Sequence, residues 1–147
     1  METPMFTARA VQELMLTSHG DLIRVFPGIP AAWPDAVFAG FRAEGAFLAG
    51  AERHGGVTRV VKIHSLAGEP CRVRPNLPGP VRAAGSRTFH LRELPDGVVE
   101  VDLQKDETVL LYTGNQVPDF KPAPVTLPGA PVHWGGQKPV PTKAKRG

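Results

Sequence analysis

The sequence predicts an all-β protein: an antiparallel β-sandwich preceded by one short N-terminal α-helix and followed by an extended tail rich in proline and glycine. Short apolar or alternating segments recur at intervals of roughly ten residues, which is typical of strands in antiparallel sandwiches and barrels. The 147 residues also include 16 glycines and 16 prolines, and this density of turn-forming residues favours short strands over long helices. We divide the chain into a helix at 1–19, a β-sandwich domain at 20–117 and a basic, proline-rich tail at 118–147.

The first expected element is a helix over residues 7–18. Val11, Leu14 and Met15 recur at helical spacing and form an apolar stripe. Gly20 is well placed as the left-handed residue that ends this helix. A helix of about three turns is not stable alone in water, so we expect the stripe to pack against another surface.

The remaining elements are expected to be strands separated by turns that contain glycine or proline. Residues 75–87 look like a loop in which a short strand at 81–83 is one alternative. Residues 88–94 and 98–103 are expected to form a hairpin around Pro95-Asp96-Gly97. The expected strands cover residues 21–26, 36–43, 46–53, 57–66, 71–74, 88–94, 98–103 and 108–113.

The basic character of the chain belongs to its tail. The formal net charge is +3, but five basic residues and no acidic residue follow Asp119, so residues 1–119 sum to −2. A mildly acidic domain does not present the positive surface that nucleic acids require, and we expect no nucleic-acid partner. The tail itself has seven prolines and four glycines from Pro118 onward, which is typical of an extended arm or linker.

Cysteine content and hydropathy exclude several classes of site. Cys71 is the only cysteine, so the chain has no internal disulfide and no multi-cysteine metal site, and we expect Cys71 to be a small apolar core residue. No run of eighteen apolar residues is present, so we expect no membrane partner. Residues 1–20 lack the charged start and apolar centre of a signal peptide.

We identify no catalytic, cofactor or metal motif. The five histidines lack metal-ligand spacing, although His64 and His90 could meet across a sheet. Asp102, Asp106 and Glu107 cluster at one hairpin end, where solvated carboxylates are the usual finding. Ser18, His19 and Asp21 supply the residue types of a catalytic triad, but a triad needs separated elements that converge in space.

Three aromatic residues are candidates for stacking on a sugar ring: Trp33, Tyr112 and Trp134. Trp33 stands among prolines in an apolar context, which favours packing. Trp134 lies in the proline-rich tail and either buries its ring or faces a ligand.

One stretch of the sequence resembles a known family pattern. Residues 13–20 read ELMLTSHG, and they are followed by VFPGIP at 25–30, Trp33-Pro34 and GFRAEGAF at 40–47. In this order and spacing they resemble the junction between the catalytic barrel and the C-terminal β-domain in glycoside hydrolase family 95, the α-L-fucosidase-like enzymes. Residues 65–68 and 71–74 also resemble a segment of that domain.

The resemblance implies a part of a glycosidase without a glycosidase site. In that family the catalytic carboxylates belong to the upstream (α/α)6 barrel, so no catalytic residue maps onto this chain. Family members commonly act outside the cytoplasm. The chain departs from the family pattern at Phe41, at Glu44 and at residues 51–56, and its tail after Pro118 has no counterpart.

Three functional hypotheses follow from these patterns. The first is a non-catalytic accessory domain that packs against the catalytic (α/α)6 barrel of a glycoside hydrolase through Val11, Leu14, Met15 and the corner from Phe26 to Trp33. The second is a free-standing carbohydrate-binding module that uses Trp33, Tyr112 or Trp134. The third is an autonomous hydrolase, which would need two carboxylates about 5–10 Å apart in a pocket.

Overall fold

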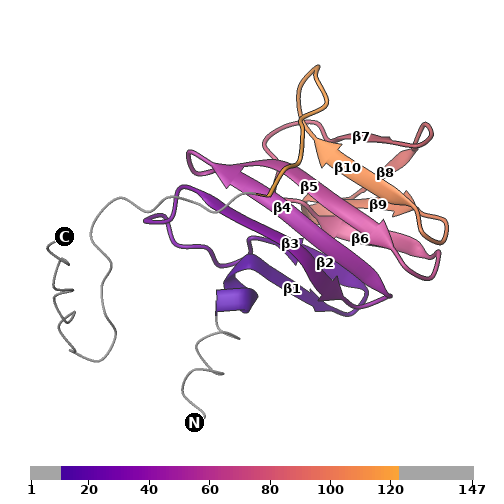
Figure 1. Ribbon diagram of the computed structural model, residues 1–147, viewed down its shortest axis with the longest axis horizontal. Coiled ribbons are helices and arrows are strands. Elements are labelled where there is room, and N and C mark those ends of the chain that lie inside the picture. The colour runs from indigo at the N-terminus through magenta and orange to yellow at the C-terminus, as the bar shows by residue number, and fades with distance from the viewer. Residues whose placement is uncertain (1–10, 123–147) are drawn as a thin grey trace, which may run out of the picture.

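The computed structural model describes residues 11–122, and it confirms a sandwich of two five-stranded β-sheets (Figure 1). Neighbouring strands are antiparallel except for β2 (Leu22–Val25) and β6 (Pro70–Arg74), which run parallel. A 3-10 turn at Pro95–Gly97 links β8 (Leu91–Leu94) to β9 (Val98–Asp102). Sheet A contains, in spatial order, β1 (Leu16–His19), β2 (Leu22–Val25), β6 (Pro70–Arg74), β9 (Val98–Asp102) and β8 (Leu91–Leu94). Sheet B contains β3 (Ala36–Ala43), β4 (Phe47–His54), β5 (Val57–Ser65), β10 (Thr108–Tyr112) and β7 (Arg82–Gly85).

The prediction of a helix up to Ser18 is wrong in its last part. Helix is present at residues 11–15, and the chain then continues as β1, which pairs with β2 in sheet A. Gly20 and Asp21 have φ values of 61° and 59°, so they form a two-residue hairpin turn rather than a helix stop. This turn places Leu16 opposite Val25, where its side chain is buried. The earlier part of the predicted helix lies outside the described residues.

The other expected strands are present with small shifts at their ends. β3 coincides with the expected range, and residues 82–85 form β7, so the loop expected at 75–87 contains a strand. The expected hairpin around residues 95–97 is confirmed, because Leu94 pairs with Val98 and Leu91 with Val101. Alternating apolar residues therefore predict these strands well, since each strand buries one face against the opposite sheet.

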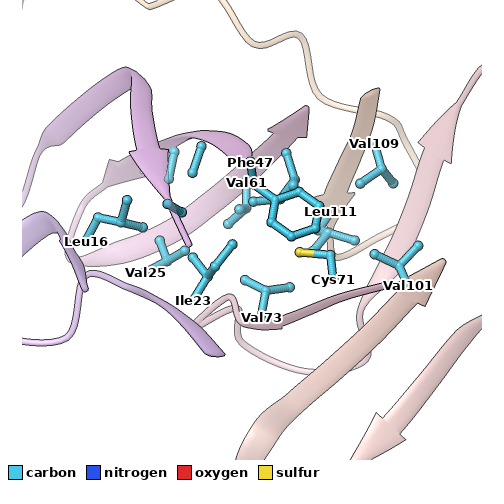
Figure 2. Packing of buried hydrophobic residues seen from close by; sticks show 14 of the residues in the cluster. Leu16, Ile23, Val25, Phe47, Val61, Cys71, Val73, Val101, Val109 and Leu111 are labelled. Atoms are coloured by element: carbon cyan, nitrogen blue, oxygen red, sulfur yellow. The ribbon is translucent and has the colours of Figure 1, made fainter. Parts of the chain in front are cut away.

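The core lies between the two sheets. In Figure 2 the side chains of sheet A point toward those of sheet B, and the Cys71 thiol is enclosed among them. Burial raises the pKa of Cys71 to about 12, so its thiol stays protonated, as expected of a core residue. The fully buried aliphatic side chains of this core include Ile23, Val25, Val73, Val101, Val61, Ile63, Val109 and Leu111.

The chain after β10 returns across the outer face of sheet B (Figure 1). The Phe120 ring lies over Gly50 of β4, and a Cβ added at Gly50 would come within 2.9 Å of Phe120 Cζ. The Lys62 ammonium is 5.9 Å from the centroid of the same ring. The packed part of the structure therefore includes Phe120, which the sequence places in the tail.

The loop between β9 and β10 is organised around the carboxylate of Glu107, whose side chain is 8% exposed. Arg87 donates to both carboxylate oxygens at 2.7 and 3.1 Å, and the Gln104 backbone N–H donates at 2.9 Å. Arg87 also stacks over the Phe89 ring and donates to the Asp102 carbonyl. These hydrogen bonds, chiefly that from Arg87, lower the pKa of Glu107.

Replacing Glu107 with glutamine is expected to lower the free energy of unfolding at pH 7. A carboxyl group whose pKa is lower in the folded state stabilises fully above its unfolded pKa of about 4.3, and this stabilisation is lost as the pH falls through the folded pKa. Urea unfolding from pH 7 to pH 3 should therefore show the two proteins converging below about pH 4. Glu93→Gln, at an exposed site, is the control, and an undiminished difference at pH 3 would contradict the assignment.

Candidate functional site

The helix at residues 11–15 is joined to the segment that follows β2. The Phe26 N–H donates to the Met15 carbonyl at 2.7 Å, and the Gly28 N–H donates to the Leu14 carbonyl at 3.4 Å. Leu14 Cδ2 lies 3.2 Å from the position that a Cβ on Gly28 would occupy, so a larger residue there would crowd Leu14. The chain entering the sandwich is thus held against the corner that follows β2.

The residues that the sequence predicts for a domain interface differ in exposure. Val11 is 36% exposed, whereas Leu14 and Met15 are half-buried and Met15 packs against the core. Phe26 is buried in the domain's own core, where its ring meets Phe38 edge-on at 5.5 Å. Phe26 therefore supports the corner from inside, and Val11 is the most exposed of these four residues.

Trp33 lies on a corner that is fixed to the β4–β5 hairpin. The Trp33 N–H donates to the Pro30 carbonyl at 3.0 Å, and the Pro34 carbonyl accepts from the Gly56 N–H at 2.9 Å. The Asp35 carboxylate accepts a hydrogen bond from the Gly55 N–H at 2.9 Å and lies 3.0 Å from His54 Nδ1. This corner presents the Trp33 side chain with 39% of its surface exposed.

The two aromatic candidates for sugar stacking that the structure describes, Trp33 and Tyr112, differ in exposure. Tyr112 is only 7% exposed on β10, which leaves little of its ring for a ligand. Trp134 lies outside the described residues. Trp33 alone among the described candidates presents a substantial surface, so a stacking role for it stays a prediction.

Four carboxylates within the described residues line one hollow, and the environment of one of them, Glu100, does not suit a general acid. A hollow of about 420 Å³ is lined by Asp21, Glu44, Glu69 and Glu100. Arg72 Nε donates to Glu100 at 2.7 Å, and this hydrogen bond lowers the pKa of Glu100. A general acid in glycoside hydrolysis needs the opposite shift, so Glu100 is unsuited to that role.

Metal and membrane features are also absent from the part of the chain that the structure describes. No three histidine, cysteine or carboxylate side chains within residues 11–122 gather as a metal site requires. His64 lies in sheet B and is hydrogen-bonded to Thr108 at 2.7 Å, while His90 precedes β8 in sheet A, so the two do not face each other across one sheet. No helix in this range has the length and hydrophobicity to cross a bilayer.

Two residues that shape the Trp33 corner and the outer face of sheet B were not predicted from the sequence. Asp35 fixes the Trp33 corner, and Phe120 covers Gly50. In the sequence, Asp35 stands just before a strand and Gly50 stands in the middle of one. Neither position identifies the residue that it contacts.

Comparison with known proteins identifies the family of the chain. Residues 17–111 match the family model described as glycoside hydrolase family 95, C-terminal domain. A search among curated proteins finds no match for the chain. The match begins in β1 and ends in β10, so it spans the sandwich from its first strand to its last. The chain therefore belongs to glycoside hydrolase family 95, whose C-terminal domain it contains.

Proposed function

We propose that the chain is a non-catalytic accessory domain that packs against the catalytic (α/α)6 barrel of a family 95 glycoside hydrolase. The contact surface consists of the helix at residues 11–15 and the corner around Trp33. The observation that carries this proposal is that the apolar helix stripe is only partly buried. Its Val11 is exposed, and the stripe lies directly before residue 17, where the family match begins. An exposed apolar side chain at the start of a C-terminal domain is well placed to meet the domain that precedes it.

The packing of this surface supports a structural role. Leu14 and Met15 are half-buried against the sandwich, and so the helix is held in place without a partner. Trp33 is exposed on a corner that backbone hydrogen bonds hold in place, which reduces the entropy lost on association, and Val11 is exposed at the start of the helix. A tryptophan on a rigid corner is a common source of binding energy at interfaces.

Isothermal titration of the chain into a family 95 catalytic barrel, produced without its own C-terminal domain, tests this proposal. We expect saturable heat that is weakened at least about tenfold by Val11→Glu or by Trp33→Ala, because each removes an apolar contact at the interface. Val117→Glu, on the segment after β10, is the control and should bind like the original chain. An absence of heat, or equal loss in all three variants, would contradict the proposal.

The exposure of Trp33 also favours a second candidate, a carbohydrate-binding module. Titration with L-fucose, galactose and a xyloglucan oligosaccharide separates the two functions. The packing proposal expects no saturable heat from these sugars. Saturable heat that Trp33→Ala removes would replace the packing proposal with a binding module.

A further inference from the structure

The outer face of sheet A has four arginines. Arg24 lies on β2, Arg72 and Arg74 lie on β6, and Arg92 lies on β8. Their neighbours along the strands, including Ile23 and Val73, are buried in the core, so alternation directs the arginines outward. β2, β6, β9 and β8 are consecutive in the sheet, so the four side chains share one surface, which we call the arginine face.

Acidic residues on the arginine face form ion pairs with only two of its four arginines. Glu100 of β9 pairs with Arg72 at 2.7 Å and with Arg92 at 3.6 Å. Asp102 lies at the end of β9, opposite Pro70. No ion pair within residues 11–122 involves Arg24 or Arg74.

Arg24 and Arg74 are also direct neighbours. The strand register places Arg24 opposite Arg74 in the parallel pair of β2 and β6. Adjacent strands are about 4.8 Å apart, and like charges in such positions repel each other. Arg74 Nε is buried without a hydrogen-bond partner, so the pair gains no compensating bond there.

This clustering is local rather than a reflection of overall charge. Residues 11–122 have 12 lysines and arginines against 13 aspartates and glutamates. Asp21 and Glu100 both lie beside Arg72, so the positive charge that no acidic residue within this range pairs with is that of Arg24 and Arg74. Guanidinium groups bind carboxylates through paired hydrogen bonds, and a carboxylate between Arg24 and Arg74 would remove their repulsion.

We propose that the arginine face binds an acidic protein surface that places carboxylates against Arg24 and Arg74. This inference rests on the proposed function, because the partner it identifies is the barrel. β1, at the edge of sheet A, follows directly from the helix at residues 11–15, and its Thr17 lies opposite Arg24, so the arginine face begins close to the helix. The strand positions that share this face include no Trp, Tyr or Phe among the described residues, and so it lacks the stacking platform that sugar-binding sites use.

The test compares Arg24→Gln/Arg74→Gln with the original chain in titrations into the catalytic barrel. We expect at least tenfold weaker binding at 50 mM NaCl and a smaller difference at 300 mM NaCl, since salt screens exposed charges. Arg59→Gln in sheet B, whose arginine pairs with Glu52, is the control and should bind like the original chain. Equal affinity of the double variant and the original chain would overturn this inference while leaving the packing proposal intact.

Two further measurements separate the remaining explanations. The melting temperature of the isolated double variant should be unchanged or higher, because repulsion is relieved, whereas a clear decrease would indicate a structural role and overturn the inference. Poly-L-glutamate should bind the original chain more tightly than the double variant, even if the barrel does not bind. Tighter binding of polygalacturonate than of poly-L-glutamate, with the same dependence on the two arginines, would assign the face to an acidic glycan instead.

Discussion

Replacing Leu111 with alanine is expected to lower the free energy of unfolding by about 2–5 kcal/mol, because it removes buried methyl groups and leaves a cavity. Leu111 is fully buried on β10, where it lies between Val61 of β5 and Ala83 of β7. Domains of this size are stable by about 5–15 kcal/mol, so the variant should lose a large part of its stability. Urea unfolding followed by circular dichroism measures the loss as a lower midpoint with an unchanged slope.

Leu110→Ala is the matched control for this experiment. Leu110 is the adjacent residue on the same strand, but its side chain is only half-buried and points to the outer face of sheet B. The same change of side chain should therefore cost much less stability at this position. Equal losses at the two positions would show that β10 does not bury the face assigned to it.

The second large effect is expected at Gly85, on the edge strand β7. A Cβ added there would lie 2.7 Å from the Thr108 carbonyl oxygen and 2.6 Å from Phe89 Cε2. The carbonyl belongs to the backbone of β10, and the Phe89 ring is buried beneath Arg87, so neither can retreat freely. Gly85→Ala is expected to cost about 1–3 kcal/mol through overpacking.

Ala84→Ser provides the comparison for Gly85→Ala. Ala84 is the preceding residue of β7, and it lines an open hollow on the outer face of sheet B. We expect a change within about 0.5 kcal/mol, as is usual for substitutions at uncrowded positions. Thermal unfolding of both variants measures the difference. An unchanged stability of Gly85→Ala would show that β7 is not held against β10 as described.

The strands could be predicted because each contains its own signal. Residues 36–43 form β3 as expected, and β5 and β10 differ from their expected ranges by a single residue at one end. Each of these strands has several apolar residues that are buried in the core, so its local sequence is enough to predict it. The fold class follows because glycine and proline separate such segments at short intervals.

The N-terminal elements could not be predicted in the same way. Leu14 to Ser18 fit a helix, and Gly20 is compatible either with a helix stop or with a hairpin turn. Pairing of Leu16 with Val25 in sheet A decides between these alternatives, and that interaction lies outside any local pattern. The parallel pairing of β2 with β6 cannot be read from a local pattern either, because paired residues such as Arg24 and Arg74 are fifty positions apart in the sequence.

The site residues inferred from the sequence stay predictions, because exposure alone does not show what a side chain contacts. The apolar stripe predicts that Val11 packs against another surface, and nothing in the sequence shows that Phe26 turns into the core. The arginine face is a stronger example, since Arg24 and Arg74 become neighbours only when β2 and β6 pair. Tertiary pairing, rather than composition, creates both of these surfaces.

The most direct test of the packing account is hydrogen–deuterium exchange of the chain alone and in the presence of a family 95 catalytic barrel. We expect slower exchange in the complex at residues 11–15, in the corner around Trp33 and in β1 and β2 beside the arginine face. Amides near Phe120, which covers the outer face of sheet B, should exchange at the same rate in both samples. Protection that is absent, or confined to the surface around Phe120, would contradict the account.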